Sequence, residues 1–166
     1  MEHIEYLKYI QDKRRNKDKR TLVFLGYFRT LCCKKGIIRK LFTKIDIEFF
    51  KTTDVYIDSK SIGGWLRMPH LNGIIVHPNA SLDENCTIFQ QVTIGANEHK
   101  LDYKKAPQIG NRVYIGAGAK NIDDITIGDD VRIGANAVIT KNIPAGKIVV
   151  GFNKIKDSIA ERKGII

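Results

Sequence analysis

Four histidines carry the clearest capacity for chemistry in this sequence: His3, His70, His77 and His99. Imidazole has an ordinary pKa of about 6.5, so it is the side chain best suited to accept a proton near neutral pH. No serine or cysteine stands out as a covalent nucleophile. The sequence therefore indicates proton transfer by a histidine, and the next question is which framework holds each imidazole in place.

The framework is an internal repeat of six residues that runs from position 109 to position 143. A period of six fits neither an α-helix nor an alternating strand. It predicts a parallel β-helix in which three hexads form one triangular coil. We expect the first residue of each hexad to point inward and to stack on the residue three hexads later. These residues are Ile109, Ile115, Asn121, Ile127, Ile133 and Ile139.

The repeat begins before this run and is interrupted once. It can be traced from residue 55 and is regular from Val76 to Ile94, and the next hexad then begins 15 residues later, at Ile109. The excess over one hexad is nine residues. It falls in residues 96–107, which are polar and charged and end in proline, so we predict a loop extruded from a corner of the coil. Loops held by rigid scaffolds often carry functional sites.

The repeat divides the chain into three parts. Residues 1–50 show helical spacing of apolar residues within 2–20 and 21–50, and we predict an N-terminal helical extension there. Residues 51–154 form the β-helix. Residues 155–166 are predicted to form a short C-terminal helix or tail over the last coil, whose open edge would invite aggregation. The predicted fold class is mainly β, with a short α-helical extension.

The chain is basic, with 28 Lys and Arg against 18 Asp and Glu, a net charge of +10. Most of the excess lies in residues 1–50, which is typical of a solvated helix face, a surface for an acidic ligand, or peripheral contact with an anionic membrane. No nucleic-acid motif is present. The start is too polar for a signal peptide, and Cys32, Cys33 and Cys86 form no disulfide framework, so we expect a cytoplasmic protein.

Four segments resemble a known family in their order and spacing. They are HLNGIIVHPNA (70–80), QQVTIG (90–95), IGNRVYIGAGAK (109–120) and IGANAVITK (133–141). They resemble the left-handed β-helix (hexapeptide repeat) acyltransferases, in particular the serine O-acetyltransferase branch and its shorter relatives from capsule and exopolysaccharide gene clusters. The resemblance covers residues 52–156. It implies a homotrimer, with acetyl-CoA as co-substrate in the groove between two neighbouring β-helices and no metal.

The resemblance also implies roles for individual residues. His70 matches the catalytic base that removes the acceptor's hydroxyl proton as its oxygen attacks the thioester. The predicted cofactor-binding residues are Gly95, Ala96, Gly116, Ala117, Gly134, Ala135 and Lys141, mostly small residues where backbone N–H groups can approach a ligand. The predicted substrate-binding residues are Asn72, Gln90, His99 and Lys105. By strict counting His70 falls on an inward position, so we expect the repeat to break there; we place His77 on a surface corner.

The chain departs from serine acetyltransferases where the acceptor binds. Pro69 replaces an Asp before the catalytic His, Tyr56 replaces the Asp that orients the base, and Lys105-Ala106-Pro107 replaces Arg-His-Pro. Asp54 or Asp58 could take over the orienting role. The acetyl-CoA half of the pattern is better preserved than the acceptor half. We therefore predict O-acetylation of a sugar in a surface-polysaccharide precursor, either a small molecule or lipid-linked. The alternative is serine O-acetyltransferase of cysteine biosynthesis.

Three other interpretations are weaker. The chain ends in Gly164-Ile-Ile166, and a terminal Ile docks serine acetyltransferases into cysteine synthase, but such an ending is common and we do not expect this partner. The γ-type carbonic anhydrases share the fold and hold zinc with three histidines, but the spacing of His70, His77 and His99 differs from theirs. A scaffold that has lost catalysis is the last alternative.

Overall fold

The computed structural model describes residues 8, 11–18, 21, 54–57, 62–97 and 105–157. The strands within these residues are short, most of them two residues long. They are β1 (Tyr56–Ile57), β2 (Ile75–Val76), β3 (Ser81–Leu82), β4 (Thr87–Ile88), β5 (Thr93–Gly95), β6 (Gln108–Ile109), β7 (Tyr114–Ile115), β8 (Lys120–Ile122), β9 (Thr126–Ile127), β10 (Arg132–Ile133), β11 (Val138–Ile139), β12 (Lys147–Val150) and β13 (Lys154–Asp157).

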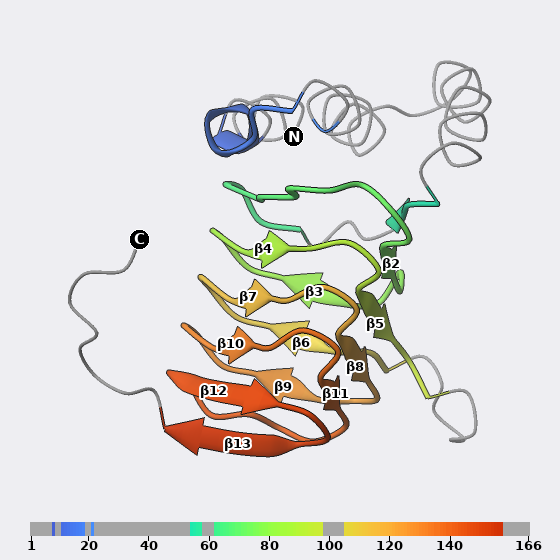
Figure 1. Ribbon diagram of the computed structural model, residues 1–166, viewed down its shortest axis with the longest axis vertical. Helices are drawn as coiled ribbons and strands as arrows, with labels where there is room; N and C mark the ends of the chain where they lie inside the picture. The colour runs from blue at the N-terminus through green and yellow to red at the C-terminus, as the bar shows by residue number, and fades with distance from the viewer. Residues whose placement is uncertain are drawn as a thin grey trace.

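The strands form three sheets, one on each side of a triangular coil (Figure 1). We name each sheet after one strand. The β5 sheet has the order β1-β2-β5-β8-β11, the β6 sheet has the order β3-β6-β9, and the β7 sheet has the order β13-β12-β10-β7-β4. All neighbouring strands are parallel except β12 and β13. The chain therefore winds as a parallel β-helix, as the hexad period predicts.

The register of the strands confirms both the coil length and the position of the extra residues. Ile115 pairs with Ile133, 18 residues away. Across the predicted loop the offset is larger: Ile94 pairs with Asn121, 27 residues away. The difference is the nine-residue excess, and all of it lies between β5 and β6. The coils on both sides of the loop therefore stack as if it were absent.

The predicted inward positions form the core. The six first positions of the hexads between 109 and 139 are at most 2% exposed, and the residues four places after them are at most 3% exposed. Burial of this continuous apolar column supplies most of the stabilisation, at roughly 25 cal/mol per Å² of apolar surface removed from water. Asn121 is the one amide among these first positions and is fully buried.

The corners of successive coils stack into three edges. The His70 edge joins the β7 sheet to the β5 sheet and contains residues 69–73, 89–91, 116–118 and 134–136. The loop edge joins the β5 sheet to the β6 sheet and contains residues 77–79, 123–124, 140–142 and the described ends of the loop, 96–97 and 105–107. The polar edge joins the β6 sheet to the β7 sheet and contains residues 83–85, 110–112 and 128–130.

The N-terminal part is helical at residues 8, 11–15 and 21. The helix predicted over residues 2–20 is wrong at residues 16–18, which are not helical. The side chain of Asp18 accepts hydrogen bonds from the backbone N–H (2.8 Å) and the hydroxyl (3.1 Å) of Thr21, a contact typical of the residue that begins a new helix. The rest of the predicted extension lies outside the described residues. In the part of the chain described, no helix has the length and apolar character needed to cross a membrane.

The C-terminal prediction needs a correction. Residues 155–157 belong to the strand β13 and not to a helix, and β13 pairs antiparallel with β12 (Figure 1). A strand satisfies the open N–H and C=O groups of the last rung directly, which a helix cannot do. The end is therefore covered, as expected, but by a returning strand. Residues 158–166 lie outside the described part.

Candidate active site

His70 lies on the outside of the coil, because the repeat breaks where the sequence indicated. The imidazole-bearing residue is exposed, while Met68, Leu71 and Ile74 fill the interior. The register shows the cause: Arg67 pairs with Thr87 and Ile75 with Thr93. The first coil thus takes eight residues where the second takes six, and the two additional residues place His70 on a widened corner.

The surroundings of His70 are aromatic. Its ring centroid lies 6.3 Å from that of Phe89 at 55°, and Phe89 lies 5.2 Å from Tyr114 at 53°. Among the described residues, none forms a hydrogen bond with the imidazole, so both ring nitrogens can face a ligand. We did not predict Phe89 from the sequence. Its signal was its place, one residue after the inward Ile88, where the side chain must turn outward.

A row of unpaired backbone donors runs along the His70 edge. Gln90, Ala117 and Ala135 occupy the same corner position in successive coils, and within the described chain their N–H groups donate to no acceptor. Their carbonyl side is used: Gly118 N–H donates to Gln90 O (2.9 Å) and Asn136 N–H to Ala117 O (2.8 Å). Unpaired donors on one line suit an extended ligand that carries carbonyl oxygens, or an oxyanion.

The glycines of this edge have a different role from the one the sequence suggested. The N–H of Gly116 donates to Ile133 O and that of Gly134 donates to Val149 O, so neither is open to a ligand. A Cβ on Gly116 would lie 2.7 Å from the nitrogen of Ala135. Glycine at 116 is therefore needed for the close stacking of coils, and the alanines that follow supply the open donors.

Two predicted substrate-binding residues also lie on the His70 edge. Asn72 is exposed, and its carbonyl oxygen accepts a hydrogen bond from the N–H of Gln91 (2.7 Å). Gln90 is half-buried, and its Oε1 atom is buried with no hydrogen-bond partner. The edge thus brings His70, Asn72 and Gln90 together with the small residues at 116–117 and 134–135.

The remaining predicted site residues lie elsewhere. Gly95, Ala96, Lys105 and Lys141 are on the loop edge, at the opposite end of the β5-sheet strands from His70. Lys105 forms an exposed ion pair with Asp124 (3.2 Å). His99 lies outside the described residues. His77 sits on a turn of the same edge and accepts a hydrogen bond from Asn79 N–H, so the surface-corner prediction is confirmed. One chain therefore presents two half-sites on separate edges.

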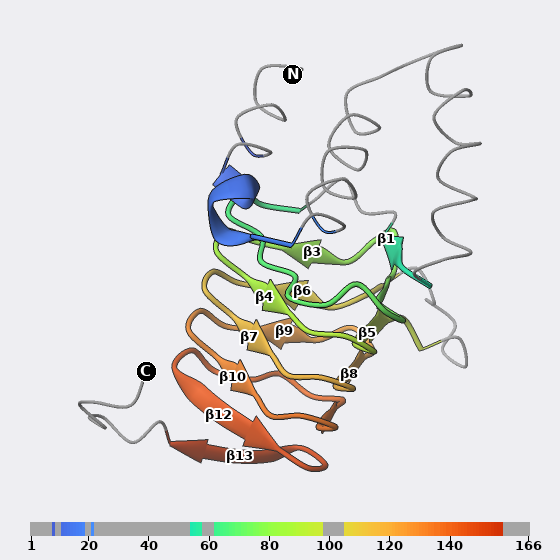
Figure 2. The ribbon, with the colours of Figure 1, turned by 45° about the horizontal axis from the view of Figure 1, so that its top comes forward.

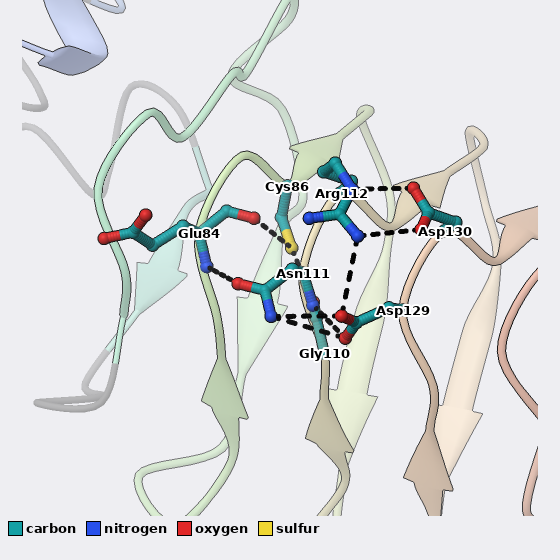
Figure 3. Close-up of polar contacts among 7 residues, drawn as sticks. All are labelled: Glu84, Cys86, Gly110, Asn111, Arg112, Asp129 and Asp130. Carbon is teal, nitrogen blue, oxygen red and sulfur yellow. Dashed lines mark hydrogen bonds and ion pairs between the residues drawn. The ribbon is translucent and has the colours of Figure 1, made fainter.

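The polar edge is a structural seam rather than a site (Figure 3). Asn111 Oδ1 accepts from the N–H of Glu84 (3.2 Å), and Asp129 Oδ1 accepts from the N–H of Asn111 (2.8 Å), so side chains link three successive coils. Arg112 binds Asp130 through two hydrogen bonds of 2.7 and 2.8 Å. This hydrogen bond and the charge of Arg112 lower the pKa of Asp130.

Cys86 lies beneath this seam and is unsuited to nucleophilic chemistry. Its Sγ donates to Gly110 O (3.2 Å), and burial raises the pKa of the thiol to about 11 (Figure 3). The reactive form of cysteine is the thiolate, which is scarce at neutral pH when the pKa is this high. Among the described residues, no group of three His, Cys, Asp or Glu side chains could hold a metal ion.

Comparison with known proteins places this geometry in a family. The model for "Bacterial transferase hexapeptide (six repeats)" matches residues 106–141. The serine acetyltransferase of Helicobacter pylori strain J99 is 33% identical over 146 residues, which cover 82% of this chain and 84% of the relative.

Two solved structures share the fold. The serine acetyltransferase of Brucella abortus superposes with a TM-score of 0.75 at 21% identity, covering 95% of this chain and 69% of that one. A serine acetyltransferase in complex with CoA superposes with a TM-score of 0.69 at 24% identity, covering 84% of this chain and 58% of that one. The predicted left-handed β-helix and the predicted enzyme class, an O-acetyltransferase, are confirmed. The chain belongs to the serine acetyltransferase family of hexapeptide-repeat acyltransferases.

Proposed function

We propose that this protein transfers the acetyl group of acetyl-CoA to the hydroxyl of serine, with His70 as the general base. The observation that carries the proposal is the placement of an exposed imidazole at the end of a row of unpaired N–H donors, in a chain that spans most of a serine acetyltransferase. One of the superposed enzymes was solved with CoA, which supports an extended thioester ligand on this edge.

The chemistry follows from these groups. The imidazole of His70 accepts the proton of the serine hydroxyl as the hydroxyl oxygen attacks the thioester carbonyl. The negative charge that develops on that carbonyl oxygen needs fixed N–H donors, and those of Gln90 and Ala117 are nearest in sequence order to His70 along the edge. When the intermediate collapses, the C–S bond breaks, and the thiolate of CoA takes up the proton that His70 holds. No covalent enzyme intermediate is required.

The acceptor is the point on which sequence and comparisons differ. The sequence analysis put a sugar hydroxyl first because Pro69, Tyr56 and Lys105 depart from the serine acetyltransferase pattern. The named relatives are serine acetyltransferases and favour the alternative, serine. A sugar hydroxyl stays the second candidate, because Tyr56 presents an exposed aromatic ring instead of a carboxylate.

We also propose a homotrimer, as the family resemblance implies. In one chain the His70 edge and the loop edge lie at opposite ends of the β5-sheet strands. Lys105 and Lys141 can reach a ligand on the His70 edge only from a neighbouring chain. Sedimentation equilibrium tests this assembly, and a protein that stays monomeric at assay concentration would contradict it.

The activity test compares two histidine variants. The purified protein is mixed with acetyl-CoA and serine, or with a panel of sugars, and the release of the CoA thiol is followed. We expect serine-dependent release, and a fall of at least about 100-fold in kcat for His70→Ala, the usual contribution of a general base. His77→Ala is the matched control, because His77 sits on the loop-edge turn, and it should keep its activity.

Each result has a clear meaning. Release that depends on a sugar and not on serine would replace serine by the second candidate. Full activity in His70→Ala would refute His70 as the base. Absence of release with every acceptor would refute the transferase proposal for this chain.

A further inference from the structure

The first described coil of the β-helix has one open side, and the N-terminal segment closes it with side chains. The helical residues drawn in blue lie over this coil in both views (Figures 1 and 2). Arg67 bonds downward, to the next coil: its N–H donates to Cys86 O, and its carbonyl accepts from the N–H of Ile88, both at 2.9 Å. In an extended chain the flanking residues, Leu66 and Met68, must present their N–H and C=O groups to the other side.

Three buried polar side chains satisfy these groups. Asp12 Oδ1 accepts from Leu66 N–H (2.7 Å), and Asn16 Nδ2 donates to Leu66 O (2.7 Å). Asn16 Oδ1 accepts from Met68 N–H (2.8 Å). The hydroxyl of Thr21 lies 3.2 Å from Met68 O and 3.1 Å from Asp18 Oδ2, and shares its one proton between them. The side chains of the N-terminal segment thus take the place of a strand.

The burial of these side chains makes the contacts strong. Asp12 and Thr21 are 0% exposed and Asn16 is 5% exposed. A buried donor or acceptor that loses its partner costs about 1–3 kcal/mol, so the backbone of residues 66–68 is held firmly only while the segment is docked. Asn16 is central, because its single amide group binds two consecutive upward-facing residues and also donates to Asp12 O (2.8 Å).

This contact ends two residues before His70. Pro69 has no N–H, so Met68 is the last residue before His70 whose N–H is bonded on this side. After Met68 the chain enters the widened corner, where it has two residues more than the coil below. The height and direction at which the chain leaves Met68 therefore decide where the imidazole stands relative to Phe89 and to the open donors of the edge.

We propose that Asn16 is a positioning residue for His70: its amide fixes the backbone of Leu66 and Met68 and thereby sets the place of the catalytic imidazole. The proposal rests on the proposed function, in which His70 is the base. It assigns to the N-terminal segment a part in the site that no motif in residues 1–50 indicates. Because the lower coils with Ala117 and Ala135 are untouched, loss of Asn16 should impair turnover more than the binding of acetyl-CoA.

The experiment measures the imidazole directly as well as its activity. In Asn16→Ala, the Cε1–H resonance of His70 should shift, because ring-current effects from Phe89 depend on the position of the imidazole. The resonance of His77, on the loop edge, should not move. Amide hydrogen exchange of Met68 should rise about tenfold or more, while that of Ile133 in β10 stays unchanged. We expect kcat to fall by about 10- to 100-fold and KM for acetyl-CoA to change by less than about twofold.

Two further variants keep the test decisive. Asn16→Asp is isosteric: it can still accept from Met68 N–H but cannot donate to Leu66 O, so its effect should be smaller, and it serves if Asn16→Ala does not fold. Asn142→Asp is the matched control, because Asn142 Oδ1 only accepts, from Thr126 N–H (2.9 Å), and a carboxylate preserves that bond. It should leave the His70 resonance and kcat as in the wild type.

The outcomes separate the two proposals. An unchanged His70 resonance and unchanged kcat in both Asn16 variants would overturn the positioning role, even if Met68 exchanges faster, because Asn16 would then be structural only. Equal losses of kcat in Asn16→Asp and Asn142→Asp would also overturn it. If the wild type shows no acetyl transfer, the proposed function fails, and the His70 resonance still decides whether Asn16 places the imidazole.

Discussion

Replacement of Asn121 by Leu should make the protein more stable. Asn121 occupies an inward position between Ile94 above and Ile139 below, where the repeat otherwise carries a branched apolar residue. It is 0% exposed, and neither Oδ1 nor Nδ2 has a hydrogen-bond partner. Leu has the same number of side-chain heavy atoms and the same branching, so it removes two polar groups with little change in shape.

The magnitude follows from the two unpaired groups. Each buried, unpaired donor or acceptor costs about 1–3 kcal/mol, and removal of both recovers this cost. Imperfect fit of two methyl groups in a close-packed core takes back about 1–3 kcal/mol. We therefore expect a net gain of about 2 kcal/mol in the free energy of unfolding. For a chain of this length that corresponds to a rise of about 4–8 °C in Tm, which thermal unfolding followed by circular dichroism can measure.

The matched control is the same substitution at Asn111. The amide of Asn111 accepts from Glu84 N–H and lies within 3.4 Å of both carboxylate oxygens of Asp129, so Asn111→Leu breaks bonds and should lower Tm. The two variants should thus have opposite signs. A Tm for Asn121→Leu equal to or below that of the wild type would refute the reasoning and would show that an internal water satisfies the amide.

Two further outcomes follow from the packing and charges. Gly116→Ala should lower the free energy of unfolding by about 1–3 kcal/mol, because its Cβ would meet backbone atoms at 2.7–2.9 Å; Gly95→Ala, whose Cβ finds nothing closer than 3.5 Å, should change it little, and equal effects in urea unfolding would contradict the packing argument. Arg112 lowers the pKa of Asp130, so this carboxylate stabilises the fold above its ordinary pKa of about 3.9, and the contribution is lost as pH falls through the lowered pKa. The stability difference between the wild type and Asp130→Asn should therefore shrink toward pH 3, and a difference independent of pH would oppose this.

The fold could be predicted because its physical cause is written in the period of the sequence. One inward residue in six, repeated over three sides, allows only a coil with three flat faces, and the jump from Ile94 to Ile109 located the interruption without any structural information. The C-terminal strand β13 could not be predicted in the same way. Its residues, Lys154–Asp157, are exposed, so they carry no inward hydrophobic signal. They form a strand because β12 offers an open edge, which is a tertiary cause.

The candidate site was predictable in part. The break at His70 was visible as a polar residue on an inward position, and the stacking of positions 117 and 135 followed from the coil length. The contributions of Phe89 and Asn16 were not visible. Phe89 meets His70 only because the first coil is two residues wider than the second. Asn16 reaches Met68 from 52 residues away, through a docking geometry that no local spacing encodes.

The register across the loop edge has a consequence for how this protein can change. The coils above and below the loop pair as though the nine additional residues did not exist, since the chain leaves and re-enters the core at neighbouring rungs. Length and composition at this corner are thus decoupled from folding, whereas an insertion at the polar edge would separate Asn111 from Asp129. The loop edge is a natural grafting point, where new segments can be exchanged to alter acceptor preference while the scaffold and the His70 edge stay as they are.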